Sequence, residues 1–191
     1  MVKIPQKGKN VSQIVIVMMI LLFCLIQNDL FSQSQKDKVH QDFLSLMDSD
    51  DKTPIYYQIV QDREWLIILS DSLKIDNLLR GGCRIKDLHE VFQNFNFELL
   101  LEQKGLVTNL DKWEKKKLHG LNTKNNIPRN GNYVQYSIPL ISGEWGTIRR
   151  QYFEDKELLE DSIIVYTRDN KEKWNQVCQL FLSMRFPSYT Y

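Results

Sequence analysis

The sequence is poor in the residues that usually carry chemistry, with only three cysteines and three histidines in 191 residues. It contains no Gly-x-Ser-x-Gly nucleophile elbow, no His-Glu-x-x-His pair, no phosphate-binding loop and no dinucleotide fingerprint. It also lacks tandem repeats, low-complexity tracts and Gly/Ser-rich linkers. These absences predict no cofactor, no metal and no recognisable enzyme class. They favour a non-enzymatic domain that binds a partner or has a structural role.

The candidate catalytic groups are isolated from one another. His89 and Glu90 are adjacent, but no second histidine follows four residues later, so a metal-binding pair is not indicated. Cys83 lies near Arg80 and Arg84, whose charges favour a reactive thiolate, but no base is evident beside it. The alternative function is therefore a small periplasmic hydrolase in which His89, Glu90 and Cys83 converge in the folded chain.

Two acidic clusters, residues 48–51 and 154–161, invite a metal or catalytic interpretation. The first fails as an EF-hand loop, because Lys52 and Thr53 stand where a further oxygen ligand and a glycine are required. The second has enough carboxylates for glycoside hydrolysis, but acidic clusters between strands are usually solvated loops. Both clusters are predicted to be exposed turns.

The charge balance excludes one class of partner. The chain has 25 basic and 24 acidic residues, a formal net charge of +1, and it therefore lacks the basic surface on which nucleic-acid affinity depends. The eight tyrosines and four tryptophans are of a type that anchors sugars and peptides, although core packing explains them equally well. The expected partner is an unidentified envelope protein or a glycan.

An uninterrupted apolar run of thirteen residues, 14–26, predicts export. It is too short for a comfortable membrane span, and the lysines before it form the positive segment of a signal peptide. Small residues place the cleavage after Ser32 or Ser34. We therefore expect a signal peptide over residues 1–32 and a single periplasmic or extracellular domain over 33–191. The alternative is a retained N-terminal anchor, the only case in which contact with a membrane is expected.

Loss of the leader removes Cys24 and leaves Cys83 and Cys178. Two thiols in an oxidising compartment can form one disulfide, and the loop that it closes would be long. The other interpretation is that Cys178 is a buried apolar side chain and Cys83 a loop thiol. The sequence does not decide between these two readings.

The first part of the mature chain is predicted to contain two strands and several helices. Runs rich in β-branched and aromatic residues predict paired strands over 55–60 and 64–69, with a loop over 70–84 and another over 122–132. Residues 97–101 fit a second short helix, and a strand over 95–101 is the alternative. Helices are predicted over residues 36–47, 85–95 and 109–118.

The last third of the chain reads as consecutive strands separated by short polar turns. The strands are predicted over residues 133–142, 147–153, 162–168 and 174–186. A helix also fits the last of these, but the short turn before it favours a hairpin. The predicted fold class is α+β, an antiparallel sheet that ends in a C-terminal meander and carries helices packed on one face.

Several short segments resemble those of small exported proteins of unknown function that are common in Bacteroidetes. Such proteins often carry a Cys-Gly-x-x-Cys-Gly segment between the last strands, and Phe153–Asp161 has none, so no redox or metal role is carried over. The resemblance implies export and the fold type and supplies no activity. The segments are Ile67–Leu73, Phe97–Gln103, Tyr136–Ser142, Ser162–Tyr166 and Lys173–Trp174.

Overall fold

The computed structural model of the chain describes residues 16–19, 33–34, 36–47, 53–61, 64–83, 88–93, 95, 112–118, 121–124, 127 and 131–185. It divides into two units, Met1–Asp37 and Lys38–Tyr191. In the first unit, residues 16–19, 33–34 and 36–37 are helical, and Gln33 Nε2 donates to Asp37 Oδ1 at 3.1 Å. Within the described residues, we find no helix with the length and apolarity needed to span a membrane. The signal peptide therefore stays a prediction.

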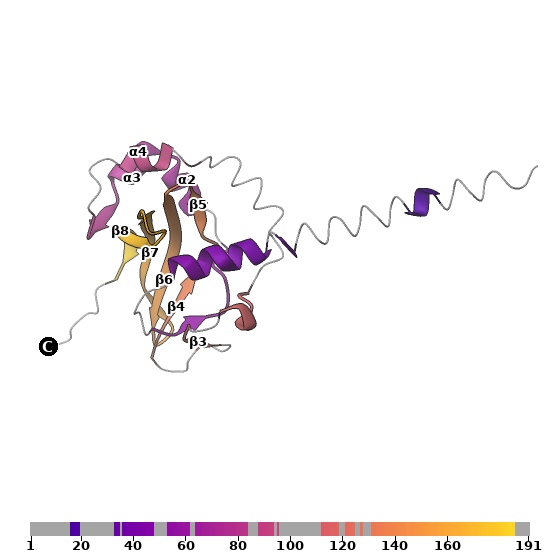
Figure 1. Cartoon of the computed structure of the whole chain (residues 1–191). Coiled ribbons are helices and arrows are strands. Elements are labelled where there is room, and N and C mark those ends of the chain that lie inside the picture. Colours follow the sequence, from indigo (N-terminus) through magenta and orange to yellow (C-terminus); the bar gives the residue numbers. More distant parts are fainter. Residues whose placement is uncertain are drawn as a thin grey trace, which may run out of the picture. The chain divides into compact units, whose positions relative to one another are not determined.

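The second unit is built on a mixed eight-stranded sheet (Figure 1). The strand order is β2-β8-β7-β6-β4-β1-β3, and β5 pairs with β6 beside this path. Strand β1 runs parallel to β3 and β4, and the other pairs are antiparallel. The strands are β1 Ile55–Tyr56, β2 Leu79–Gly81, β3 Thr123–Lys124, β4 Asn132–Tyr136, β5 Leu140–Ser142, β6 Trp145–Glu154, β7 Glu157–Arg168 and β8 Trp174–Met184.

The C-terminal meander β6-β7-β8 is confirmed, and so is the strand chosen for residues 174–186. Asp169 fixes its second turn, because its Oδ1 accepts from the backbone N–H groups of Lys171 and Lys173, each at 2.9 Å. These hydrogen bonds lower the pKa of Asp169 below its usual 3.8, and the one from Lys173 has the largest effect. A short, locally satisfied turn of this kind returns the chain directly into the neighbouring strand.

The first turn of the meander corrects the prediction of an acidic loop over 154–161. Strand β6 ends at Glu154 and β7 begins at Glu157, so only Asp155 and Lys156 form the turn. Both have positive φ, 46° and 73°, as a two-residue hairpin turn requires. Asp155 Oδ1 also accepts from the backbone N–H of Gly131 at 2.7 Å. The acidic residues that follow therefore lie within a strand.

Alternate residues of β7 point into two different cores. Ile164 and Tyr166 pack in the first core with Phe43 and Leu46 of the helix over residues 38–46, which lies within the helix predicted for 36–47. Ile163 and Val165 pack in the second core, together with residues of three helices. These helices are α2 (Glu64–Leu69), α3 (Ser72–Asp76) and α4 (Leu88–Gln93). Figure 1 shows α2, α3 and α4 grouped together and the helix over 38–46 running across the strands.

The predicted α+β class and C-terminal meander are thus confirmed, and the structure adds two features. The parallel strand β1 has no counterpart in the predicted antiparallel sheet. Helices also contribute to a core on each face of the sheet, because neighbouring residues of β7 belong to different cores.

Two predictions around residue 70 are wrong. Residues 64–69 form helix α2, in which Trp65, Leu66 and Leu69 are buried at helical spacing while Ile67 is 52% exposed. The five consecutive apolar residues 65–69 fit a strand or a buried helix equally well, so the pattern alone did not decide. The loop predicted over 70–84 contains α3 and β2. Asp71 caps the N-terminus of α3, because its side chain accepts hydrogen bonds from the backbone N–H groups of Leu73 and Lys74.

The helix predicted over 109–118 is wrong in its described part, because only Lys115–Lys117 forms a helical turn, the 3₁₀ helix η1. Long-range contacts hold the segment in an extended form. The backbone N–H of Trp113 donates to the backbone carbonyl of Tyr57 at 2.9 Å, and the Trp113 ring stacks on Phe43 with centroids 4.0 Å apart. Such distant partners leave no local pattern in the sequence.

The remaining differences are ones of extent. The strand predicted over 55–60 is regular only in β1, and the loop predicted over 122–132 contains β3. The strand predicted over 133–142 is split into β4 and β5 by residues 137–139, because Pro139 has no backbone N–H to donate. Helix α4 confirms the helix predicted over 85–95 for residues 88–93, and Phe95 lies beyond its end. Residues 48–51 and 97–101 lie outside the described residues.

Candidate functional site

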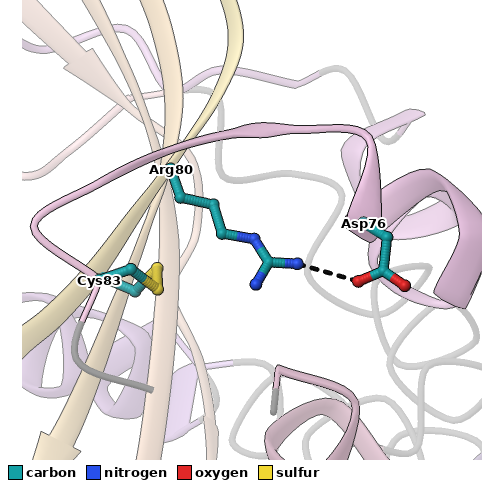
Figure 2. Close-up of a disulfide and its surroundings, with 4 residues drawn as sticks. Asp76, Arg80 and Cys83 are labelled. Carbon is teal, nitrogen blue, oxygen red and sulfur yellow. Dashed lines mark hydrogen bonds and ion pairs between the residues drawn. A yellow bond between two sulfur atoms is a disulfide. The ribbon is translucent and has the colours of Figure 1, made fainter. Parts of the chain in front are cut away.

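Cys83 and Cys178 form a disulfide, with an S–S distance of 2.04 Å. It joins the residue that follows the Gly81-Gly82 pair to a fully buried position of β8, and Figure 2 shows it beside the α3–β2 segment. Strand pairing prepares the bond, since Gly81 is in register with Gln179. The free-thiol interpretation of Cys83 is therefore wrong: its sulfur is bonded, and it supplies no thiolate nucleophile.

Next to the disulfide, Asp76 connects α3 to β2 and to α4. Its Oδ1 accepts from Arg80 Nη2 of β2 at 2.9 Å, and its Oδ2 lies 3.2 Å from His89 Nε2 of α4. Figure 2 shows the Arg80 side chain extending toward Asp76. We call Asp76, Arg80 and His89 the Asp76 triangle. Its side chains are 30–56% exposed, so its ion pairs contribute little to stability.

The triangle lowers the pKa of Asp76 below its usual 3.8. The hydrogen bond from His89 is the largest cause, and the charges of His89 and Arg80 add to it. A depressed carboxyl pKa means that the contacts of ionised Asp76 are fully present above about pH 4 and are lost as the pH falls through the lower value in the folded protein. The triangle is therefore intact at neutral pH.

We expect His89→Ala to raise the pKa of Asp76 toward 3.8, and to raise it more than Arg80→Ala does, because the hydrogen bond from His89 is the larger cause. A pH titration of the Asp76 carboxyl carbon by NMR measures both shifts in the folded protein. If Arg80→Ala moves the pKa more than His89→Ala, the assignment of the dominant contact is contradicted.

A pocket of about 560 Å³ opens beside the triangle, at the ends of α2, α3 and α4. This volume lies within the range of small-molecule sites. Four apolar side chains form what we call its floor and four polar ones its rim, and the described lining contains no Lys, Arg, Asp or Glu. The floor is Leu69, Ile75, Phe92 and Phe95, and the rim is Ser70, Ser72, His89 and Gln93.

The structure brings only some of the predicted site residues together. His89 lines the pocket and belongs to the triangle, whereas Cys83 is bonded to Cys178. The side chain of Glu90 is not among the parts that the structure describes. Buried His40 has a structural role, since its Nε2 accepts from the backbone N–H of Glu114 at 3.0 Å. In the described part of the chain, no group of three or more His, Cys, Asp or Glu residues could hold a metal ion.

Sequence reasoning missed the pocket because two of its walls were assigned wrongly. Leu69 was placed on a strand and Ile75 in a loop. Phe92 was correctly placed on a helix with no indication of what it faces, and Phe95, predicted on the same helix, lies just beyond its end. Asp71 was the usable signal. It is a good N-cap residue before Ser72, and a helix beginning there directs Ile75 inward.

Comparisons of the chain with protein-family models, with curated proteins and with solved structures found no match. The function must therefore be argued from the geometry of the pocket and its surroundings.

Proposed function

We propose that the protein is an exported, non-enzymatic domain that binds a ligand in the pocket at the ends of α2, α3 and α4. The pocket carries the proposal: it combines an apolar floor with a polar rim, which is the usual composition of a ligand site. The surrounding cross-links support it. The disulfide and the Asp76 triangle connect β8, β2, α3 and α4, so the lining residues are held before a ligand arrives.

Export is supported by two independent features. The apolar run at residues 14–26 has the length and the basic flank of a signal peptide. The disulfide is consistent with an oxidising compartment, where such bonds persist. Together they favour a periplasmic or extracellular domain whose ligand is found in the cell envelope.

The binding proposal is tested by closing the pocket. Ser72→Trp places a large side chain at the rim, whereas Leu73→Trp replaces a neighbouring side chain that is 75% exposed and does not line the pocket. Each protein is incubated with an envelope extract of the source cells, re-isolated and denatured, and the released molecules are identified by mass spectrometry. We expect the same ligand from the wild type and Leu73→Trp, and none from Ser72→Trp. Equal recovery from Ser72→Trp would contradict the proposal.

One observation favours a hydrolase as the second candidate. Asp76 orients His89 at the rim of the pocket, as a carboxylate orients a general-base histidine, and Ser70 and Ser72 are nearby lining residues. A hydrolase would lose about 10²-fold or more of its rate with His89→Ala. The binding account expects equal rates for wild type and His89→Ala with p-nitrophenyl acetate. A loss of that size in the variant would favour the hydrolase.

A further inference from the structure

The disulfide fastens the short edge strand β2 to its neighbour β8. Strand β2 and the two residues after it form the segment 79–83, which we call the latch. We infer that this fastening is redox-sensitive: a dithiol reductant breaks the disulfide, and the latch then separates from β8. Opening of the latch is a property of the domain itself, whereas its effect on the pocket rests on the binding function proposed above.

The strand pairing of the latch is a weak attachment. Strand β2 has three residues and lies at one end of the strand order, with β8 as its neighbour. The Leu79 side chain is 68% exposed and Arg80 is also exposed, so the strand buries little apolar surface. Short elements with few buried apolar contacts open locally at a small cost in free energy. The pairing of β2 with β8 therefore needs further support.

The disulfide supplies this support. Gly81 lies in register with Gln179, and Cys83 is bonded to Cys178, the residue before Gln179 in β8. The bond keeps an opened strand within a few residues of its partner, and closing so short a loop costs little conformational entropy. Without the bond, the latch must return to β8 from a much larger set of conformations. Breaking the disulfide should therefore raise the population of the opened latch.

The two sulfurs differ in accessibility, which sets the order of the reaction. Cys178 is fully buried, whereas Cys83 is only partly buried. A thiolate of the dithiol therefore attacks Sγ of Cys83, and the electron pair of the broken bond goes to Sγ of Cys178, which takes up a proton. The second thiolate of the reductant then attacks the reductant's own sulfur in the mixed disulfide, and Cys83 leaves as a thiolate that is protonated. The protein gains two thiols, and the reductant becomes a disulfide.

Release of the latch reaches the pocket through α3. This helix has five residues, too few to be stable alone, and it supplies Ser72 and Ile75 to the pocket lining. Buried Ile75 attaches α3 to the second core, and Asp76 near its C-terminal end accepts from Arg80 of the latch. The latch is thus a second attachment of α3. In the oxidised protein this wall of the pocket is fixed, and reduction loosens it.

Access to the disulfide is tested on the folded full-length protein without denaturant. The monothiol β-mercaptoethanol should form a mixed disulfide on Cys83, which peptide mass mapping locates after acid quenching. The dithiol dithiothreitol should convert both cysteines into thiols that react with iodoacetamide. An adduct on Cys178 instead of Cys83, or reduction that requires urea, would overturn the inference.

Release of the latch is tested by limited proteolysis with trypsin, which cuts after Arg80 when the strand opens. The protein is reduced with dithiothreitol, separated from it under nitrogen and compared with the oxidised protein. We expect cleavage after Arg80 to become about tenfold faster on reduction, while cleavage after Arg168 of the meander changes much less. Equal acceleration at both sites would indicate general unfolding, and an unchanged rate at Arg80 would indicate a closed latch. Either result overturns the inference.

Two cysteine variants provide matched controls for the proteolysis. Cys83→Ala combined with Cys178→Ala should be cut after Arg80 as fast as the reduced wild type. Cys24→Ala also loses a thiol but retains the disulfide, so it should behave like the oxidised wild type. A double variant that resists trypsin as well as the oxidised protein does would contradict the role of the bond.

The latch and the binding function fail in different ways. After incubation with the envelope extract, the double cysteine variant should release less of the molecule that the wild type carries. If the latch opens and this recovery is unchanged, the connection between the latch and the pocket is overturned. If Ser72→Trp also retains the molecule, the pocket itself is not the binding site.

Discussion

Replacing both Cys83 and Cys178 with alanine should lower the free energy of unfolding by about 4–5 kcal/mol. The two cysteines are 95 residues apart, and a cross-link over a loop of this length removes that much conformational entropy from the unfolded chain in the loop-closure treatment. Urea unfolding of the wild type and the double variant, followed by tryptophan fluorescence, measures the difference.

Reductant provides the matched control for this prediction. Wild-type protein in dithiothreitol should lose about the same 4–5 kcal/mol, whereas the double variant should not respond, because it has no bond to break. A wild type that is equally stable with and without reductant would show that Cys83–Cys178 does not restrain the unfolded chain.

The second large effect is expected at a buried ion pair on the sheet. Arg149 Nε and Nη2 donate to the two oxygens of Asp161 at 2.8 and 2.6 Å, and both side chains are only 8% exposed. Asp161→Asn should lower the free energy of unfolding by about 3–5 kcal/mol, because it removes the negative charge that Asp161 places against the buried Arg149 guanidinium. Urea unfolding of the oxidised proteins measures the loss.

Two comparisons isolate the charge at this site. Glu157→Gln alters an exposed carboxylate of the same strand and should change stability by no more than about 0.5 kcal/mol. Arg149→Met combined with Asp161→Leu should recover most of the loss, since well-packed apolar residues replace a buried ion pair at little cost. A double variant as unstable as Asp161→Asn would mean that loss of the ion pair itself, and not burial of the remaining Arg149 charge, sets the effect.

The ion pair, and Cys178 at one end of the disulfide, lie in the part of the sheet that was most predictable from sequence. Runs such as Ser162–Arg168 are long enough and sufficiently β-branched to indicate strands, and polar residues such as Asp169 mark where the chain turns. These signals are local, so they can be read without the fold. The disulfide was one of two interpretations of Cys83 and Cys178, and register between β2 and β8 decides between them.

The parts that were not predictable depend on contacts between distant residues. Trp113 is held in extended backbone by Tyr57, more than fifty positions away, although its spacing with Leu118 suggests a helix. The pocket combines residues from α2, α3 and α4, and two of these helices were predicted as strand or loop. A site made by several short elements has no sequence motif of its own, and only their packing brings it together.

Isolation of the protein from its own cells, followed by intact mass measurement before and after alkylation without reductant, tests the account most directly. If the domain is exported and disulfide-bonded, we expect a chain that begins at Gln33 or Gln35. We also expect it to gain no mass on alkylation, because Cys83 and Cys178 are bonded and Cys24 has been removed. A protein that retains Met1 and gains the mass of three alkyl groups would contradict both the export and the disulfide on which the proposed binding site depends.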